Sequence, residues 1–152
     1  MNMPRRITRL TIRVLDSIAQ FLPKHKSEAQ HLVTGRRGEE EAYFYLRKNG
    51  YVITARNYRT PNSRSELDMI GWDGETLCFI EVKTRSFRDE LLPAESAVDF
   101  EKQRDLCRVA REFLRKSRKK ADPPIRFDIV TVYLEPEVGP QIAILKDAFT
   151  MV

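Results

Sequence analysis

Hydrophobic residues along the chain alternate in some segments and recur at helical spacing in others. Helical spacing predicts one helix from His31 to Asn49, ended by Gly50, and a second from Asp99 to Lys116. Strand-like runs cover residues 51–58, 66–72, 76–84, 125–134 and 141–145. The predicted order is therefore helix, three strands, helix and two strands.

The first 22 residues have a separate amphipathic pattern. Their apolar side chains form a stripe opposite four arginines, which predicts a basic helix over residues 5–22 that ends near Pro23. Residues 23–30 are polar and lack a period, so we expect a linker there and boundaries of 1–30 and 31–152 for the two parts. The stripe either packs on its own domain or contacts a partner protein, a nucleic acid or an anionic membrane surface.

The second and third strands should form a hairpin. Asp73-Gly74 lies between them, and this dipeptide readily adopts the positive φ angles of a tight turn. A two-residue turn at this dipeptide places Asp68 opposite Phe79. Asp68 and Glu81 then become diagonal neighbours on one face, with Cβ atoms about 7 Å apart.

This hairpin carries the candidate chemistry. In Glu81-Val82-Lys83 the carboxylate and the amine point to one face of a strand that is otherwise apolar, where unpaired charges are costly. The carboxylates of Asp68 and Glu81 could converge on a hard divalent cation, Mg²⁺ or Mn²⁺, and leave coordination positions for a phosphate. Glu39 shares the apolar face of the first helix, so it is either a third acid of this site or an acid that favours the helix dipole.

Composition and charge narrow the function class only slightly. The chain has 152 residues, the size of one ordinary domain, and 27 basic against 22 acidic residues give a net charge of +5, which suits a polyanionic partner. Cys78 and Cys107 form no CxxC pair, which predicts reduced, buried cysteines. No uninterrupted apolar stretch follows the N-terminal arginines, so we expect a cytoplasmic protein.

Six short segments occur in a fixed order over roughly residues 31–150. They are Gly35-Arg-Arg-Gly38-Glu39, Leu46-Arg-Lys-Asn-Gly50-Tyr51, Asn57-Tyr58-Arg59, Glu66-Leu-Asp68-Met-Ile70, Phe79-Ile-Glu81-Val-Lys83-Thr-Arg85 and Arg126-Phe-Asp128. Together they resemble the YraN-type family of bacterial proteins. That family is grouped by similarity with the PD-(D/E)xK nuclease superfamily, and its acid, Asp, Glu-x-Lys order is also similar to archaeal Holliday-junction resolvases.

The resemblance implies an α/β fold of the restriction-endonuclease type, with a central mixed sheet flanked by helices. It implies that Asp68 and Glu81 are metal ligands, that Lys83 lies beside the attacking water, and that Glu39 is a further acid near the metal. It points less specifically to Gln103, early in the second helix, as another catalytic candidate.

Two further positions of the resemblance leave alternatives open. Lys102 could approach the same groove in place of its neighbour Gln103. Glu66 matches the family's Gly-Glu-Ile-Asp motif, and it either supports the site or pairs with Arg64 or Arg85. Arg126 and Asp128 are expected to be a structural pair.

The expected function is a metal-dependent endonuclease that hydrolyses DNA phosphodiester bonds, with branched or junction DNA as candidate substrates. Arg36, Arg59, Arg64 and Arg85 are the candidates for contacts with nucleic-acid phosphates. One alternative is a non-catalytic nucleic-acid-binding module. Another is an adaptor that contacts a membrane or a partner protein through residues 5–22, and a homodimer is an option for assembly.

Overall fold

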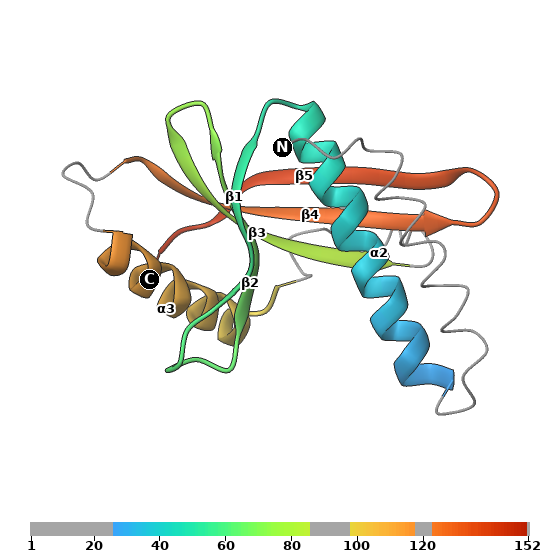
Figure 1. Cartoon of the computed structure of the whole chain (residues 1–152), viewed down its shortest axis with the longest axis horizontal. Helices are drawn as coiled ribbons and strands as arrows, with labels where there is room; N and C mark the ends of the chain where they lie inside the picture. The colour runs from blue at the N-terminus through green and yellow to red at the C-terminus, as the bar shows by residue number, and fades with distance from the viewer. Residues whose placement is uncertain (1–25, 86–97, 118–122, 152) are drawn as a thin grey trace. The chain divides into compact units, whose positions relative to one another are not determined.

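The computed structural model of the chain describes residues 26–85, 98–117 and 123–151 (Figure 1). The chain divides into two compact units, residues 1–37 and 38–152. Helix α2 (Lys26–Lys48) begins in the first unit, five residues earlier than the hydrophobic pattern predicts, so residues 26–30 are helical. The basic helix predicted over residues 5–22 lies outside the described residues. Neither described helix is long and apolar enough to cross a membrane.

The second unit is built on a mixed five-stranded sheet in the order β1-β2-β3-β4-β5. Its strands are β1 (Val52–Arg59), β2 (Glu66–Asp73), β3 (Thr76–Arg85), β4 (Ile125–Glu135) and β5 (Gly139–Phe149). β3 and β4 are parallel, and the other neighbours are antiparallel. Parallel strands need a long crossover, and α3 (Phe100–Ser117) lies between these two in the sequence. The expected α/β fold with a mixed sheet flanked by helices is confirmed.

Each face of the sheet has its own hydrophobic core. α3 packs on one face with residues that include Phe79, and the part of α2 after residue 37 packs on the other with residues that include Ile80. These neighbours of β3 point to opposite faces because side chains alternate along a strand. Cys78 and Cys107 are free and buried, one in each core, as predicted.

The hairpin between β2 and β3 turns one residue later than predicted. Asp73 pairs with Thr76, so Gly74, with a φ of 61°, is the first of the two turn residues. Asp73 stays in the strand because its carboxylate binds the side chains of Arg126 and Lys146, each at 2.7 Å. These partners lie on β4 and β5, so the sequence of the turn alone could not predict this pairing.

The later turn changes which residues face one another. Phe79 pairs with Ile70, and the predicted pairing of Phe79 with Asp68 is wrong. The pairing of β2 with β3 runs from the turn to Met69 and Ile80. Beyond that point β2 continues beside β1, while β3 continues beside β4. β2 and β3 diverge beyond this point (Figure 1), and Asp68 lies directly beyond the last paired position of β2.

Candidate active site

Asp68 occupies the point at which β2 leaves β3. Its Oδ2 accepts a hydrogen bond from the backbone N–H of Val82, with an N–O distance of 2.6 Å. The side chain thus replaces the backbone acceptor that a continuing strand would offer to Val82. Met69 pairs with Ile80, so Asp68 and Glu81 are the residues directly beyond the last paired positions of β2 and β3.

The surroundings of Asp68 oppose its ionisation. Burial raises the pKa of Asp68 to about 7, and the negative charge of Glu81 is the second cause. The charge of Glu39 raises this pKa as well, whereas the hydrogen bond from Val82 and the charge of Lys102 lower it. The charges of Glu81 and Glu39 therefore both act on Asp68, although the three acids come from three separate elements.

Glu81 is buried against two lysines. Its Oε1 lies 3.0 Å from Lys83 Nζ and 3.4 Å from Lys102 Nζ, and its side chain is 6% exposed. The other oxygen, Oε2, is buried without a hydrogen-bond partner in the part of the chain that the structure describes. The prediction that Glu81 and Lys83 share one face of the strand is confirmed.

Glu39 reaches this region from α2 and is held by an asparagine of β1. Its Oε2 accepts a hydrogen bond from Asn57 Nδ2 at 3.2 Å. Asn57 comes opposite Asp68 in the β1–β2 register and has a φ of 49°, a conformation that asparagine tolerates better than most residues. The sequence analysis gave Asn57 no role, although an asparagine within a strand is an unusual choice.

Gly38 determines how closely α2 approaches β3. A Cβ at this position would clash with Thr84 Oγ1 and would lie 2.8 Å from Thr84 Cβ, so the observed approach requires glycine. Glu39 follows Gly38 in the helix, and Thr84 follows Lys83 in the strand. This one contact therefore positions two residues of the candidate site.

Lys102 is the residue of α3 that reaches the carboxylates. Its neighbour Gln103 instead donates a hydrogen bond from Nε2 to the backbone oxygen of Val98 at 3.0 Å, just before the helix begins. Adjacent residues of a helix point about 100° apart, so only one of the two can face Glu81. The structure places Lys102 at the site and Gln103 at the start of α3.

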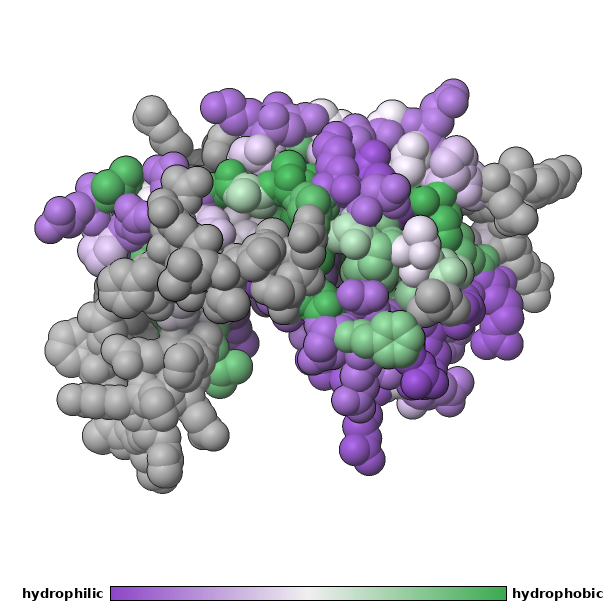
Figure 2. Space-filling model, turned by 180° about the vertical axis from the view of Figure 1, so that it is seen from behind, coloured by the Kyte–Doolittle hydropathy of each residue, from purple (hydrophilic) through white to green (hydrophobic). Residues whose placement is uncertain are grey.

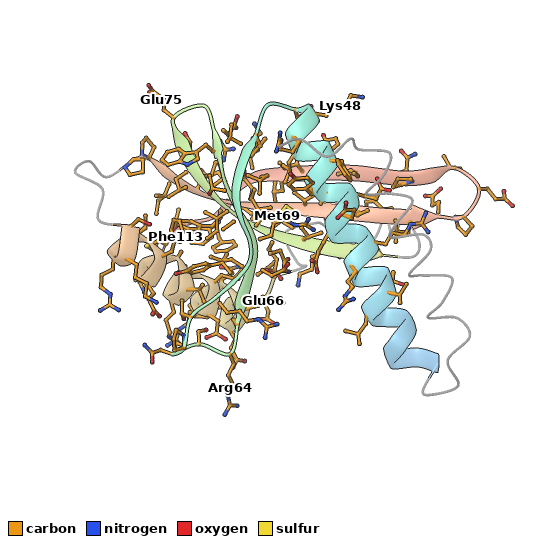
Figure 3. The ribbon with its side chains drawn as sticks, in the orientation of Figure 1. Lys48, Arg64, Glu66, Met69, Glu75 and Phe113 are labelled. Carbon is orange, nitrogen blue, oxygen red and sulfur yellow. The ribbon has the colours of Figure 1, made fainter. Side chains whose placement is uncertain are left out.

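The four arginines predicted to contact nucleic acid lie in different surroundings. Arg59 pairs with Glu66, so the predicted partners of Glu66, Arg64 and Arg85, are wrong. Arg64 points outward from the connection between β1 and β2 (Figure 3). Arg85 is half-buried at the end of β3, and Arg36 is exposed on the part of α2 that belongs to the first unit.

Arg126 and Asp128 form a separate polar network at the other end of β3. Arg126 Nε binds Asp128 Oδ1 at 2.7 Å, and the hydroxyl of Tyr51 donates to Asp128 Oδ2 at 3.1 Å. The backbone N–H of Asp147 also donates to Asp128 Oδ1, at 3.1 Å. Both oxygens of the buried carboxylate are thus occupied by the protein itself, which fits the expected structural pair.

The carboxylates of Asp68 and Glu81 suit a divalent cation whose remaining ligands are water molecules or phosphate oxygens. In residues 26–85, 98–117 and 123–151, no three His, Cys, Asp or Glu side chains form a ready-made metal cluster. Mg²⁺ commonly uses only one or two carboxylates and completes its shell with water and phosphate oxygens. Asp68 and Glu81, with the unpartnered Oε2 of Glu81, fit such a partial ligand set.

Comparison with known proteins identifies relatives along nearly the whole chain. The model of the Uncharacterised protein family UPF0102 matches residues 38–132, which include Glu39, Asp68, Glu81 and Lys83. A UPF0102 protein of Koribacter versatilis is 57% identical over 97% of both chains. A UPF0102 protein of Solibacter usitatus is 47% identical over 76% of this chain and 84% of its own. The chain therefore belongs to the UPF0102 family, the YraN-type family that its motifs resemble.

Proposed function

We propose that the protein is a metal-dependent nuclease that hydrolyses phosphodiester bonds of DNA. The observation that carries this proposal is the meeting of Asp68, Glu81 and Lys83 where β2 and β3 separate. A buried carboxylate whose ionisation is opposed by its surroundings is stabilised by a nearby cation, so the surroundings of Asp68 favour metal binding. A lysine next to the same carboxylates adds a donor for a water or a phosphate oxygen.

Each residue has a distinct task in the proposed reaction. Asp68 and Glu81 hold Mg²⁺ or Mn²⁺, which when bound supplies Lewis-acid chemistry at the scissile phosphate. Lys83 is 30% exposed, so its ammonium group can both touch Glu81 and reach a water that attacks the phosphate. Its positive charge also offsets negative charge that develops as the phosphodiester reacts. Glu39 adds a third acid whose charge already acts on Asp68.

The proposed substrate class follows from the charge of the chain and of the site. The chain has a net charge of +5, and Lys83 and Lys102 place two partly exposed ammonium groups at the carboxylates. Such groups attract the phosphates of a nucleic acid without reading its sequence. We therefore expect cleavage with little base preference, and we expect the structure of the DNA to decide what is cut.

The direct test is incubation of the purified protein with linear, flapped and four-way-junction DNA in Mg²⁺ or Mn²⁺. We expect cleavage that EDTA stops and that Asp68→Asn abolishes, because the amide keeps the shape of the side chain and loses the charge. Glu75→Gln is the matched control, since Glu75 is an exposed acid at the β2–β3 turn (Figure 3). Cleavage by a folded Asp68→Asn protein would exclude this site.

The lysine role is tested separately from binding. We expect Lys83→Ala to lower kcat far more than it weakens DNA binding, because the group acts mainly on the reacting phosphate. Lys48→Ala, an exposed change at the end of α2, should alter neither quantity (Figure 3). Equal losses of affinity and turnover would make Lys83 a phosphate anchor, and binding of DNA without any metal-dependent cleavage would indicate a non-catalytic binding protein.

A further inference from the structure

The exposed side of α3 carries a row of arginines that the proposed chemistry does not use. Arg104, Arg108, Arg111 and Arg115 follow one another at spacings of four, three and four residues, and all four are exposed. These spacings place side chains next to one another along one side of a helix. The opposite side of α3 is buried in the core, so this arginine row faces solvent.

An exposed aromatic residue begins the same row. Phe100 lies four residues before Arg104, and 65% of its surface is exposed. Arginines bind phosphates of any sequence, whereas an exposed aromatic ring can stack on a base only where that base is unpaired. Figure 2 shows hydrophilic residues gathered around α3 at the lower right of the view.

The acids of α3 reduce the positive charge of this surface only partly. The helix contains six basic and three acidic residues, a net charge of +3. Asp105 is already engaged by Arg108 at 2.9 Å and by the hydroxyl of Ser65 at 3.2 Å. Glu112 is paired with Lys116 at 2.9 Å. Arg108 keeps 57% of its side chain exposed despite its pair, so it remains accessible to a phosphate.

The position of α3 connects this row to the candidate active site. Lys102, two residues before Arg104, has its ammonium group 3.4 Å from Glu81. From Arg104 to Arg115 the helix extends about 16 Å, which is the axial length of about five nucleotides of a base-stacked strand. A strand that lies along the row therefore has one end close to the carboxylates.

We infer that Phe100 and the arginine row of α3 bind a single-stranded segment of the nucleic acid. The arginines contact successive phosphates, and Phe100 stacks on an unpaired base. The identification of the ligand as nucleic acid rests on the proposed function, whereas the surface itself does not depend on catalysis. The protein should then favour flapped or branched DNA, which offers an unpaired strand beside the bond to be cut.

The test measures binding in EDTA, so that no cleavage contributes. A fluorescein-labelled 20-nucleotide single strand and a blunt duplex of the same sequence are titrated by fluorescence anisotropy. Arg104→Gln/Arg115→Gln should lower the slope of log affinity against log salt on the single strand by about 1.4, and the affinity about 25-fold near 0.1 M salt. Arg47→Gln/Lys48→Gln removes the same charge from the end of α2 and should leave binding nearly unchanged.

The aromatic contact is tested by Phe100→Ala. We expect at least about a fivefold loss of affinity for the single strand, no loss for the blunt duplex, and recovery with Phe100→Trp. Unchanged single-strand binding by Phe100→Ala, or an equal loss on the duplex, would overturn single-strand recognition. If the arginine variant binds the single strand as tightly as the α2 control does, the arginine row of α3 does not bind nucleic acid.

These outcomes are separate from those of the nuclease proposal. A wild-type protein that cleaves nothing, but binds single strands through α3, would contradict only the nuclease proposal. An active nuclease whose single-strand binding is unaffected by the α3 variants would contradict only this inference. Circular dichroism melting of each variant establishes that the exposed substitutions leave the protein folded.

Discussion

Replacing Gly38 by alanine should push α2 away from β3, although alanine is the better helix former. The added Cβ would lie 2.8 Å from both Cβ and Cγ2 of Thr84, besides the closer contact with Oγ1. Rotation of the threonine side chain moves its Oγ1 and Cγ2 but not its Cβ. An ordinary contact needs 3.4 Å or more, so the helix or the strand has to move by about 0.6 Å.

The expected cost comes from two opposing effects. Overpacking of this kind costs about 1–3 kcal/mol of unfolding free energy, whereas exchange of glycine for alanine within a helix gains about 1 kcal/mol. Gly35→Ala is the matched control, because its Cβ would have no atom within 4 Å. Gly38→Ala should therefore be less stable than Gly35→Ala by about 1–3 kcal/mol.

Urea unfolding followed by the fluorescence of Trp72, the chain's single tryptophan, measures this difference. Trp72 packs against the core under α3, so its emission reports unfolding of the sheet. In a Thr84→Gly background the substitution at Gly38 should instead stabilise, because the clashing atoms are gone. Equal stability of Gly38→Ala and Gly35→Ala would refute the close packing of α2 on β3.

Three further predictions concern the proton on Asp68, the ion pair of Arg126 with Asp128, and the different roles of Lys102 and Gln103. In metal-free protein the free energy of unfolding should fall as the pH rises from 3.8 towards about 7, because folded Asp68 retains a proton that the unfolded chain has released. Urea titrations at several pH values should show this decrease. The variant Asp68→Asn should not show it. Arg126→Ala should cost about 3–5 kcal/mol of stability, since it leaves the buried carboxylate of Asp128 without its cation, and a loss below about 1 kcal/mol would contradict the network. Lys102→Ala should lower kcat and leave the melting temperature nearly unchanged, because Lys102 contacts Glu81. Gln103→Ala should lower the melting temperature and leave kcat nearly unchanged, because Gln103 binds the backbone before α3. The opposite result would assign the site role to Gln103 and the structural role to Lys102.

The order and type of the described elements could be predicted from the sequence because they depend on local periodicity. The second strand, expected over residues 66–72, ends at Asp73, and the second helix, expected from Asp99, begins at Phe100. The start of α2 was missed because residues 26–30 favour a helix without showing an apolar period. Amphipathic patterns reveal only those parts of a helix that are covered by a core.

The sequence by itself determined the family, the succession of helices and strands, and the pairing of Glu81 with Lys83, since residues two apart on a strand share a face. Only the tertiary structure decided that Phe79 pairs with Ile70 and not with Asp68, because this register depends on residues of distant strands that bind Asp73. It also decided that Lys102 reaches the carboxylates. Such contacts join residues far apart in the chain, and packing of the helices on the sheet fixes them, whereas local patterns specify only how each element folds.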